Sequence, residues 1–375
     1  MNKSLKKCGS LFLASSIVVG VLAGCGTKEK SEGAAEDSGK EIKIGMNLEL
    51  SGPVASYGSG IEKGANLAIE EINKAGGIDG KQIKVIKVDN KSESSEATAA
   101  AIKLATRDKV VAQIGSVTSG NTLASVQVAN KYKMPMIGPS ATSPSVTVDD
   151  KTNKVNDYVF RTFFIDPFQG KIAANFAVDT LKEKNVAIFS DSSSDYAKVL
   201  AKSFKETIES KGGKVVSEEA YVAKDTDFKS TLTRLKSQNP DFIYIPGFYE
   251  EVGLIVNQAR DAGIKAPLMG GDGWDSPKIL ELAGADALND TYFTNHYSFE
   301  DPDEKIPKFV TAFKDAIEKV RSTDSEKVQK ALAETKDLDL VTGNFSVDEN
   351  HYSVKTATVL EFKDGKQVSN SKVNP

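Results

Sequence analysis

The sequence is poor in the side chains that most catalytic and metal sites use. It contains two histidines and two cysteines, Cys8 and Cys25, among 375 residues, which allow one disulfide at most. Because both cysteines lie in the N-terminal export pattern described below, no cysteine is expected to remain for a structural zinc site. It also lacks the motifs of a serine nucleophile elbow, a phosphate-binding loop and a zinc protease. His296 and His351 fall near strand or turn patterns, where structural or surface roles are expected. These absences predict no catalytic residue and no metal site, and they disfavour an enzyme.

A nucleotide cofactor is not expected either. Gly58-Ser59-Gly60 precedes a helical pattern and Asp89 ends the next strand pattern, which is a weak match to a dinucleotide-binding loop. The loop after Leu48 is too long, and Gly64 comes one residue late for the third glycine. A dehydrogenase-like enzyme is therefore only a distant alternative. The formal net charge of −4 argues against a nucleic-acid partner.

Long hydrophobic runs are scarce, and the one near the N-terminus is short. It covers residues 11–23, follows three lysines and ends in Leu22-Ala23-Gly24-Cys25, which is too short to span a bilayer comfortably. The pattern resembles a bacterial lipobox. It predicts a lipoprotein signal peptide over 1–24, a lipidated Cys25 and a flexible tether over 25–40, with an ordinary secretory signal as the alternative. The mature chain would then carry 45 basic and 52 acidic residues, a formal charge of −7.

Strand and helix patterns alternate along the rest of the chain. Alternation of this kind predicts an α/β protein with mostly parallel sheets. Strands are expected at 42–48, 83–88, 110–114, 186–189, 215–221, 242–245, 267–269 and 292–296, with a short strand ending at Ile137. Helices are expected at 61–72, 97–105, 168–181, 196–208, 228–235, 252–262, 309–320 and 328–333.

The two halves of this alternation are similar to each other. Three pairs of turn residues recur with the same separation of 132 residues: Gly115 and Gly247, Pro135 and Pro267, and Gly138 and Gly270. Equal separations and matching element order indicate two lobes of similar plan. The same shift places residues 140–142 opposite residues 272–274. Two equivalent loops are therefore expected to face each other across a cleft, where ligands often bind.

Polar residues in the turns after the strands are candidate ligand groups. Ser119 lies where a helix starts, and the free N–H groups and dipole there favour a carboxylate. Simple N-capping is an equal alternative for Ser119. The hydroxyls of Ser119 and Thr142 can add hydrogen bonds, and Asp272 can pair with an ammonium group or only form a turn. Aromatic residues on the same rim are Tyr57, Tyr196, Phe248 and Trp274.

The order of motifs strongly resembles that of the substrate-binding proteins of branched-chain amino acid ABC transporters, the Leu/Ile/Val-binding family. The matching segments begin with IKIGMNLELSGPVASYGSGIEKGANLAIEEINKAGGI and continue through IGPSATSP, FRTFFIDPFQG, DSSSDYAKVLAKSF, DTDFKSTL, QARDAGIKAPLMGGDGWDSP and VTGNFSVDEN. The resemblance implies a type I periplasmic binding protein, with two Rossmann-like lobes joined by a hinge that the chain crosses several times. The first lobe is expected to contain 41–161 and 290–336, and the second 162–289 and 337–375.

The resemblance also implies a role for particular residues. Ser119, Ser140 and Thr142 match positions that hold the α-carboxylate and α-ammonium of an amino acid, and Asp272 matches the acidic partner of the ammonium. The side-chain pocket and its cover correspond to Tyr57, Val117, Thr118, Ala141, Tyr196, Phe248 and Gly273, with Trp274 at the cleft. One segment departs from the family, because residues 309–320 join STDSEK directly where relatives have a longer piece with a further helix.

These observations together predict an exported, lipid-anchored and monomeric protein. It would capture free leucine, isoleucine or valine and deliver the ligand to ABC permease subunits in the membrane. The alternatives are a ligand-sensing module of the same fold that feeds a receptor, and a binder of another small amino acid or amide.

Overall fold

A computed structural model describes residues 41–298, 309–340, 343–353 and 357–373. The predicted signal peptide, the tether and Cys25 lie outside the described residues. Across the part that is described, no helix combines the length and the hydrophobicity needed to cross a membrane.

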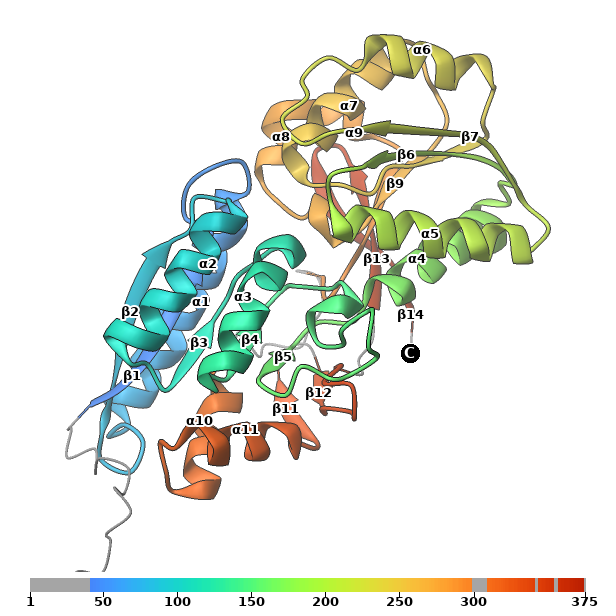
Figure 1. The fold of residues 1–375 in the computed structure, drawn as a ribbon. Coiled ribbons are helices and arrows are strands. Elements are labelled where there is room, and N and C mark those ends of the chain that lie inside the picture. Colours follow the sequence, from blue (N-terminus) through green and yellow to red (C-terminus); the bar gives the residue numbers. More distant parts are fainter. Residues whose placement is uncertain (1–40, 299–308, 341–342, 354–356, 374–375) are drawn as a thin grey trace, which may run out of the picture. The chain divides into compact units, whose positions relative to one another are not determined.

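The first lobe is built on a five-stranded parallel sheet in the order β2-β1-β3-β4-β5 (Figure 1). Its strands are β1 Glu41–Leu48, β2 Gln82–Asp89, β3 Ala112–Ile114, β4 Met136–Gly138 and β5 Val159–Arg161. The helices between them are α1 Ala55–Lys74, α2 Ser94–Lys103 and α3 Ser119–Tyr132, and a π-helical turn, Leu104–Asp108, extends α2. The predicted alternation of strands and helices is confirmed here, while β5 was not predicted.

The second lobe is built on a seven-stranded sheet in the order β14-β13-β10-β9-β8-β6-β7 (Figure 1). Its strands are β6 Asn185–Asp191, β7 Lys214–Tyr221, β8 Phe242–Tyr244, β9 Leu268–Gly270, β10 Thr291–Asn295, β13 Ala357–Lys363 and β14 Lys366–Val373. Its helices are α4 Asp166–Asn175, α5 Asp195–Ser210, α6 Lys229–Ser237, α7 Tyr249–Asp261, α8 Lys278–Ala283 and α9 Ala285–Leu288. The antiparallel β13–β14 hairpin turns at Asp364-Gly365.

The two lobes repeat the same strand order. The order β2-β1-β3-β4-β5 in the first sheet matches β7-β6-β8-β9-β10 in the second. The 132-residue shift also holds for the last pair of strands, because Met136 pairs with Val159 in the first sheet and Leu268 with Thr291 in the second. The predicted similarity of the two halves is confirmed, and it extends one strand further than the sequence indicated.

Close backbone approach explains why glycine recurs at this spacing. A Cβ on Gly115, whose φ is +101°, would lie 2.1 Å from the carbonyl oxygen of Asn47. A Cβ on Gly247 would lie 1.9 Å from the hydroxyl oxygen of Tyr221. Both glycines therefore allow the chain to leave a central strand against a neighbouring element.

The hydrophobic core of the first lobe includes two late helices. Ile42, Ile44 and Met46 alternate inward along β1 and pack with residues of α1. The helices α10 Phe309–Val320 and α11 Ser325–Ala333 place Ile317 and Leu332 in the same buried cluster. The short connection between these helices therefore still allows both to pack on the first lobe.

The predicted division into lobes is wrong at two places. The strand β10, expected in the first lobe, lies between β9 and β13 of the second sheet. Val347, expected in the second lobe, is buried in the first-lobe cluster, and Nδ1 of His351 lies 2.9 Å from the carbonyl oxygen of Val159. A local pattern reveals a strand but not the sheet that it joins, which is why the boundaries at residues 290 and 337 failed. The rest of the division stays a prediction.

Candidate functional site

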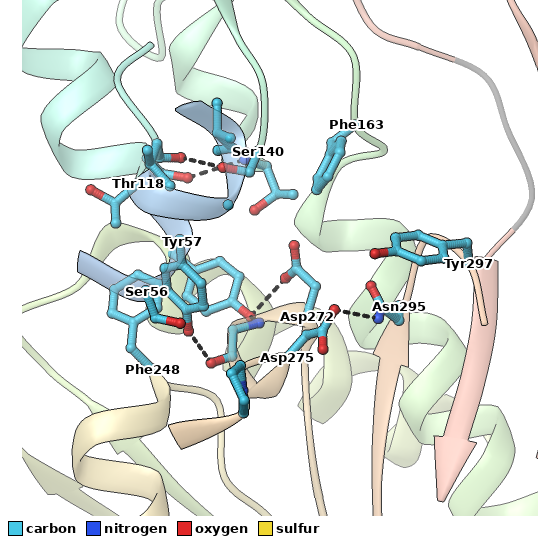
Figure 2. Close-up of a pocket in the computed structure, with 18 residues that line it drawn as sticks. Ser56, Tyr57, Thr118, Ser140, Phe163, Phe248, Asp272, Asp275, Asn295 and Tyr297 are labelled. Carbon is cyan, nitrogen blue, oxygen red and sulfur yellow. Dashed lines mark hydrogen bonds between the residues drawn. The ribbon is translucent and has the colours of Figure 1, made fainter. Parts of the chain in front are cut away.

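A cavity of about 360 Å³ is lined by residues of both lobes. Figure 2 shows Thr118 and Ser140 at one end of this pocket, Asn295 and Tyr297 at the other, and Asp272 between them. Ten of the twelve predicted ligand-binding residues line it: Tyr57, Val117, Thr118, Ser119, Ser140, Thr142, Tyr196, Phe248, Asp272 and Gly273. The turns after β4 and β9 thus converge as the repeat predicted, and the turn after β3 lines the same pocket.

Two predicted residues do not reach the pocket wall. Trp274 is completely buried in the second-lobe core, where its indole N–H donates to the carbonyl oxygen of Ile245 at 3.0 Å. The expectation that Trp274 lies at the cleft is therefore wrong, because its large apolar ring packs inward from the turn that carries Asp272. Ala141 is also fully buried, and its carbonyl oxygen accepts a hydrogen bond from Arg161.

The two first-lobe turns are hydrogen-bonded to each other. Oγ of Ser119 accepts from the backbone N–H of Thr142 at 3.2 Å and of Ser143 at 3.1 Å. The hydroxyl of Ser140 donates to the carbonyl oxygen of Val117 at 2.8 Å. Ser119 is the first residue of α3 and is only 2% exposed. These bonds hold the start of α3 and the turn after β4 as one polar wall.

Asp272 is a buried acid held by neutral donors. Its Oδ1 accepts from the hydroxyl of Tyr196 at 2.8 Å and from the amide of Gln169 at 3.0 Å. Burial raises the pKa of Asp272 to about 6, although these two hydrogen bonds act in the opposite direction. Nε2 of His296 lies 3.5 Å from Oδ2. The site therefore holds a carboxylate that a bound cation would stabilise.

Further acids surround this group. Burial, together with the charge of Asp272, raises the pKa of Asp166 well above its usual value. Burial also raises the pKa of Asp275, which lines the pocket and accepts from Asn295 at 2.9 Å. The eighteen residues drawn around the pocket in Figure 2 include no Lys, Arg or His. This lining therefore favours a ligand that carries a positive group.

An aromatic wall faces the polar turns. The rings of Tyr196 and Phe248 stack 5.1 Å apart at an interplanar angle of 9°. Tyr57, from α1 of the first lobe, packs edge-on against Phe248 of the second lobe at 6.1 Å. Its hydroxyl donates to the carbonyl oxygen of Gly273. Tyr57 therefore both covers an apolar part of the pocket and joins the two lobes.

Sequence reasoning missed several residues that the structure brings to this site. Gln169 was inside a quoted motif but was not singled out, and it both donates to Asp272 and accepts from the backbone N–H of Asp272 at 3.1 Å. The lining residues that were missed are Ser56, Gly60, Ile61, Phe163, Asp275, Pro277, Asn295 and Tyr297. Asn295 ends β10, and Tyr297 follows two residues later. Because β10 was predicted to belong to the first lobe, these two residues were not expected near the pocket. His296 is buried and not on the surface.

The arrangement is suited to binding a ligand that has both polar and apolar groups. In the parts of the chain that the structure describes, no three His, Cys, Asp or Glu side chains are grouped to hold a metal ion. Polar turns, a buried acid and an aromatic wall together offer separate contacts for an anionic group, a cationic group and an apolar group.

Two repeated lobes with a ligand-sized pocket at their strand ends define a bilobal ligand-binding protein. The chain belongs to the periplasmic binding protein family, which matches residues 41–316. The resemblance recognised in the sequence is thereby confirmed. The match ends inside α10, close to the segment that departs from the family.

Curated relatives and solved structures agree with this assignment. The chain is 33% identical over 329 residues to the leucine-, isoleucine-, valine-, threonine- and alanine-binding protein of Pseudomonas aeruginosa, covering 82% of this chain and 86% of the relative. It is similar in fold to the branched-chain amino acid transporter substrate-binding protein LivJ of Streptococcus pneumoniae in complex with isoleucine, with a TM-score of 0.83, 40% identity and coverage of 89% and 100%. The leucine-binding protein LivK of Thermotoga maritima gives a TM-score of 0.82, 31% identity and coverage of 89% and 99%.

Proposed function

We propose that this protein captures a branched-chain or related aliphatic amino acid as the substrate-binding component of an ABC importer. The observation that carries the proposal is the position of buried Asp272 between the polar turns of the first lobe and the aromatic wall. An α-amino acid has one group to match each of these three parts: a carboxylate for the polar turns, an ammonium group for Asp272 and a side chain for the aromatic wall. In the zwitterion the first two of these groups are charged. The relatives whose names describe leucine, isoleucine or valine binding support the same ligand class.

In this proposal each end of the ligand has its own partners. Ser119, Ser140 and Thr142 receive the α-carboxylate, and Asp272 pairs with the α-ammonium. Charge-assisted hydrogen bonds of this kind are about twice as strong as neutral ones. The aliphatic side chain contacts Tyr57, Tyr196 and Phe248, with Val117, Thr118 and Gly273 completing the surroundings. Ligand binding would favour the closed arrangement of the lobes, in which Tyr57 reaches Gly273.

A thermal-shift screen followed by calorimetry tests the ligand. Leucine, isoleucine and valine should raise the unfolding temperature, while glutamate and lysine should not. A ligand at 100 times its Kd adds about 2.7 kcal/mol of stability. Asp272→Asn should abolish the response and Asp261→Asn, at an exposed position at the end of α7, should keep it. A flat response of the wild-type protein to all common amino acids would refute the proposal.

We also propose that residues 1–24 direct export and that Cys25 carries a lipid anchor. The basic start, the short apolar run and the cysteine support this. Cys25→Ser should release the protein from the membrane fraction of a bacterial host and abolish incorporation of labelled palmitate. Membrane retention of the variant without labelling would contradict a lipid anchor.

The importer role is separable from a sensing role. Deletion of the gene should abolish uptake of radiolabelled ligand if the protein serves a permease. If the protein instead feeds a receptor, uptake should persist while a ligand-dependent response is lost. Size-exclusion chromatography coupled to light scattering tests the proposed monomer.

A further inference from the structure

A buried carboxylate lies behind the polar turn at the start of α3. Glu49, immediately after β1, has no exposed surface. Its Oε1 accepts from the backbone N–H of Thr118 at 3.0 Å, from the hydroxyl of Thr118 at 3.0 Å and from the amide of Asn121 at 2.9 Å. Its Oε2 accepts from the backbone N–H of Val117 at 3.0 Å and from the amide of Asn90 at 3.2 Å. Five donor contacts therefore converge on one side chain.

The chemistry of these contacts requires a carboxylate. Each oxygen of Glu49 receives one backbone N–H, and a backbone N–H cannot be turned away as an amide or hydroxyl can. A carboxamide would place its NH₂ group against one of these N–H groups, whichever way it was oriented. The buried donor left without an acceptor would destabilise this arrangement.

Glu49 also connects the strand ends that carry the pocket. The amide of Asn90, which follows β2, donates to Glu49 and lies 3.1 Å from Oδ1 of Asn47 on β1 and 3.3 Å from Oγ of Ser116. Asn121 in turn belongs to the first turn of α3. One network therefore joins the ends of β1 and β2, the turn after β3 and the start of α3.

This network decides which donors face a ligand. Val117 and Thr118 line the pocket, yet their N–H groups are directed to Glu49. The N–H groups of Ser119 and Gly120 lie in the first turn of α3 and have no acceptor within the helix. Within the described residues, neither of these two N–H groups donates to another protein group. They remain for an anion at the helix start, where the dipole favours negative charge.

We infer that Glu49 is a positioning residue for the carboxylate-binding end of the pocket. It fixes the turn formed by residues 116–118. This turn then places Ser119 so that its hydroxyl oxygen can accept from the backbone N–H of Thr142. This inference rests on the proposed amino-acid ligand, but the geometry of Glu49 can be tested without any ligand.

The test compares Glu49→Gln with a matched control. Glu251→Gln removes another buried carboxylate, which accepts from the backbone N–H of Lys224 in the second lobe at 2.7 Å and is not among the residues that line the pocket. Calorimetry measures the Kd of leucine and of leucinamide, in which a neutral amide replaces the carboxylate. Glu49→Gln should raise the Kd of leucine at least tenfold and the Kd of leucinamide less than threefold. Glu251→Gln should leave the ratio of the two Kd values unchanged.

Ligand-free hydrogen exchange gives an independent reading. The amides of Val117 and Thr118 should exchange at least tenfold faster in Glu49→Gln than in the wild type or in Glu251→Gln. Equal weakening of leucine and leucinamide, or unchanged exchange of these two amides, would overturn the inference. If wild-type protein binds no leucine, the proposed ligand fails, while exchange still decides the role of Glu49. If Glu49→Gln does not fold, Asn121→Ala is the alternative variant, because it removes one donor to Glu49 that lies outside the pocket lining. It should raise the Kd of leucine about threefold and leave the Kd of leucinamide unchanged. Equal effects on the two Kd values would again refute the inference.

Discussion

The hydroxyl of Tyr196 donates to Oδ1 of Asp272 at 2.8 Å and accepts from the backbone N–H of Gly273 at 2.9 Å. A single phenol thus links the acid of the pocket to the backbone of its own turn. Because Tyr196 also stacks on Phe248, the polar and apolar parts of the site are built from the same side chain. Displacement of this ring would therefore disturb both the ammonium partner and the aliphatic wall.

Ligand affinity should depend on the protonation of Asp272. The pKa of this buried carboxyl is about 6, and only the ionised form pairs with an ammonium group. Affinity for leucine should therefore be roughly constant above pH 7 and fall about tenfold for each pH unit well below 6. Calorimetry from pH 5 to 8 measures this, and binding near pH 6 should release protons. A flat affinity profile over that range would contradict the pairing.

The same acid should cost stability when no ligand is bound. Between its usual pKa of 3.8 and about 6, folded Asp272 retains a proton that the unfolded chain has released. Its contribution to the free energy of unfolding therefore falls as pH rises through this window. At pH 7.5, Asp272→Asn should therefore have a free energy of unfolding roughly 1–3 kcal/mol higher than wild type and unfold at a higher temperature, although it no longer binds ligand. A variant destabilised at that pH would refute this account.

The repeated architecture could be predicted from the sequence alone because it requires particular residues and patterns in short stretches of the chain. The glycines at 115 and 247 are required by close backbone approach, and the amphipathic patterns of β1 and α5 reflect which face is buried. The glycines and the amphipathic patterns are visible in short stretches of sequence, even where the contact that requires them is distant in the chain, as between Gly115 and Asn47. They therefore located both the alternating elements and the turns that line the pocket.

The support behind the pocket could not be predicted in this way. Glu49 and Gln169 act through contacts that span about 70 and 103 residues in sequence, and polar residues near loops give no sign of being buried. Trp274 was misplaced for a related reason, since an aromatic residue in a turn can face the pocket or the core. Only the position of α7 and the second sheet decides between them.

Tyr57 should control how long a ligand stays bound. Its hydroxyl joins α1 of the first lobe to the carbonyl oxygen of Gly273 in the second, so Tyr57→Phe removes a bond made only when the lobes are close. The dissociation rate of leucine should increase about threefold to tenfold with little change in the association rate. Stopped-flow displacement measures both rates, with exposed Tyr132→Phe as the control. A change confined to the association rate would contradict this role.

Trp274 should report on the core and not on the ligand. It is fully buried, and its indole N–H donates to Ile245. Quenching of its fluorescence by acrylamide should be weak both with and without leucine. Trp274→Phe leaves the carbonyl oxygen of Ile245 without this donor and should cost about 1–3 kcal/mol in chemical denaturation, with less than a threefold change in Kd. A large loss of affinity at unchanged stability would place Trp274 in the site after all.

Arg161 should be needed for the turn that carries Ser140 and Thr142. This fully buried guanidinium donates to the carbonyl oxygens of Ala141 at 3.1 Å and Ser143 at 2.7 Å, and burial lowers its pKa to about 10. Lysine has one compact ammonium and cannot reproduce the planar fork.

Arg161→Lys should therefore lower the free energy of unfolding by about 2–4 kcal/mol. It should also lower the affinity for leucine by more than the loss of folded protein alone would explain. Urea denaturation and calorimetry measure the two effects, and Arg107→Lys, at an exposed ion pair with Asp108, should change neither. Because the fork of Arg161 holds two carbonyl groups of the turn itself, those of Ala141 and Ser143, loss of affinity should persist in the folded variant at low temperature. Recovery of full affinity there would mean that Arg161 stabilises the lobe without shaping its ligand-binding turn.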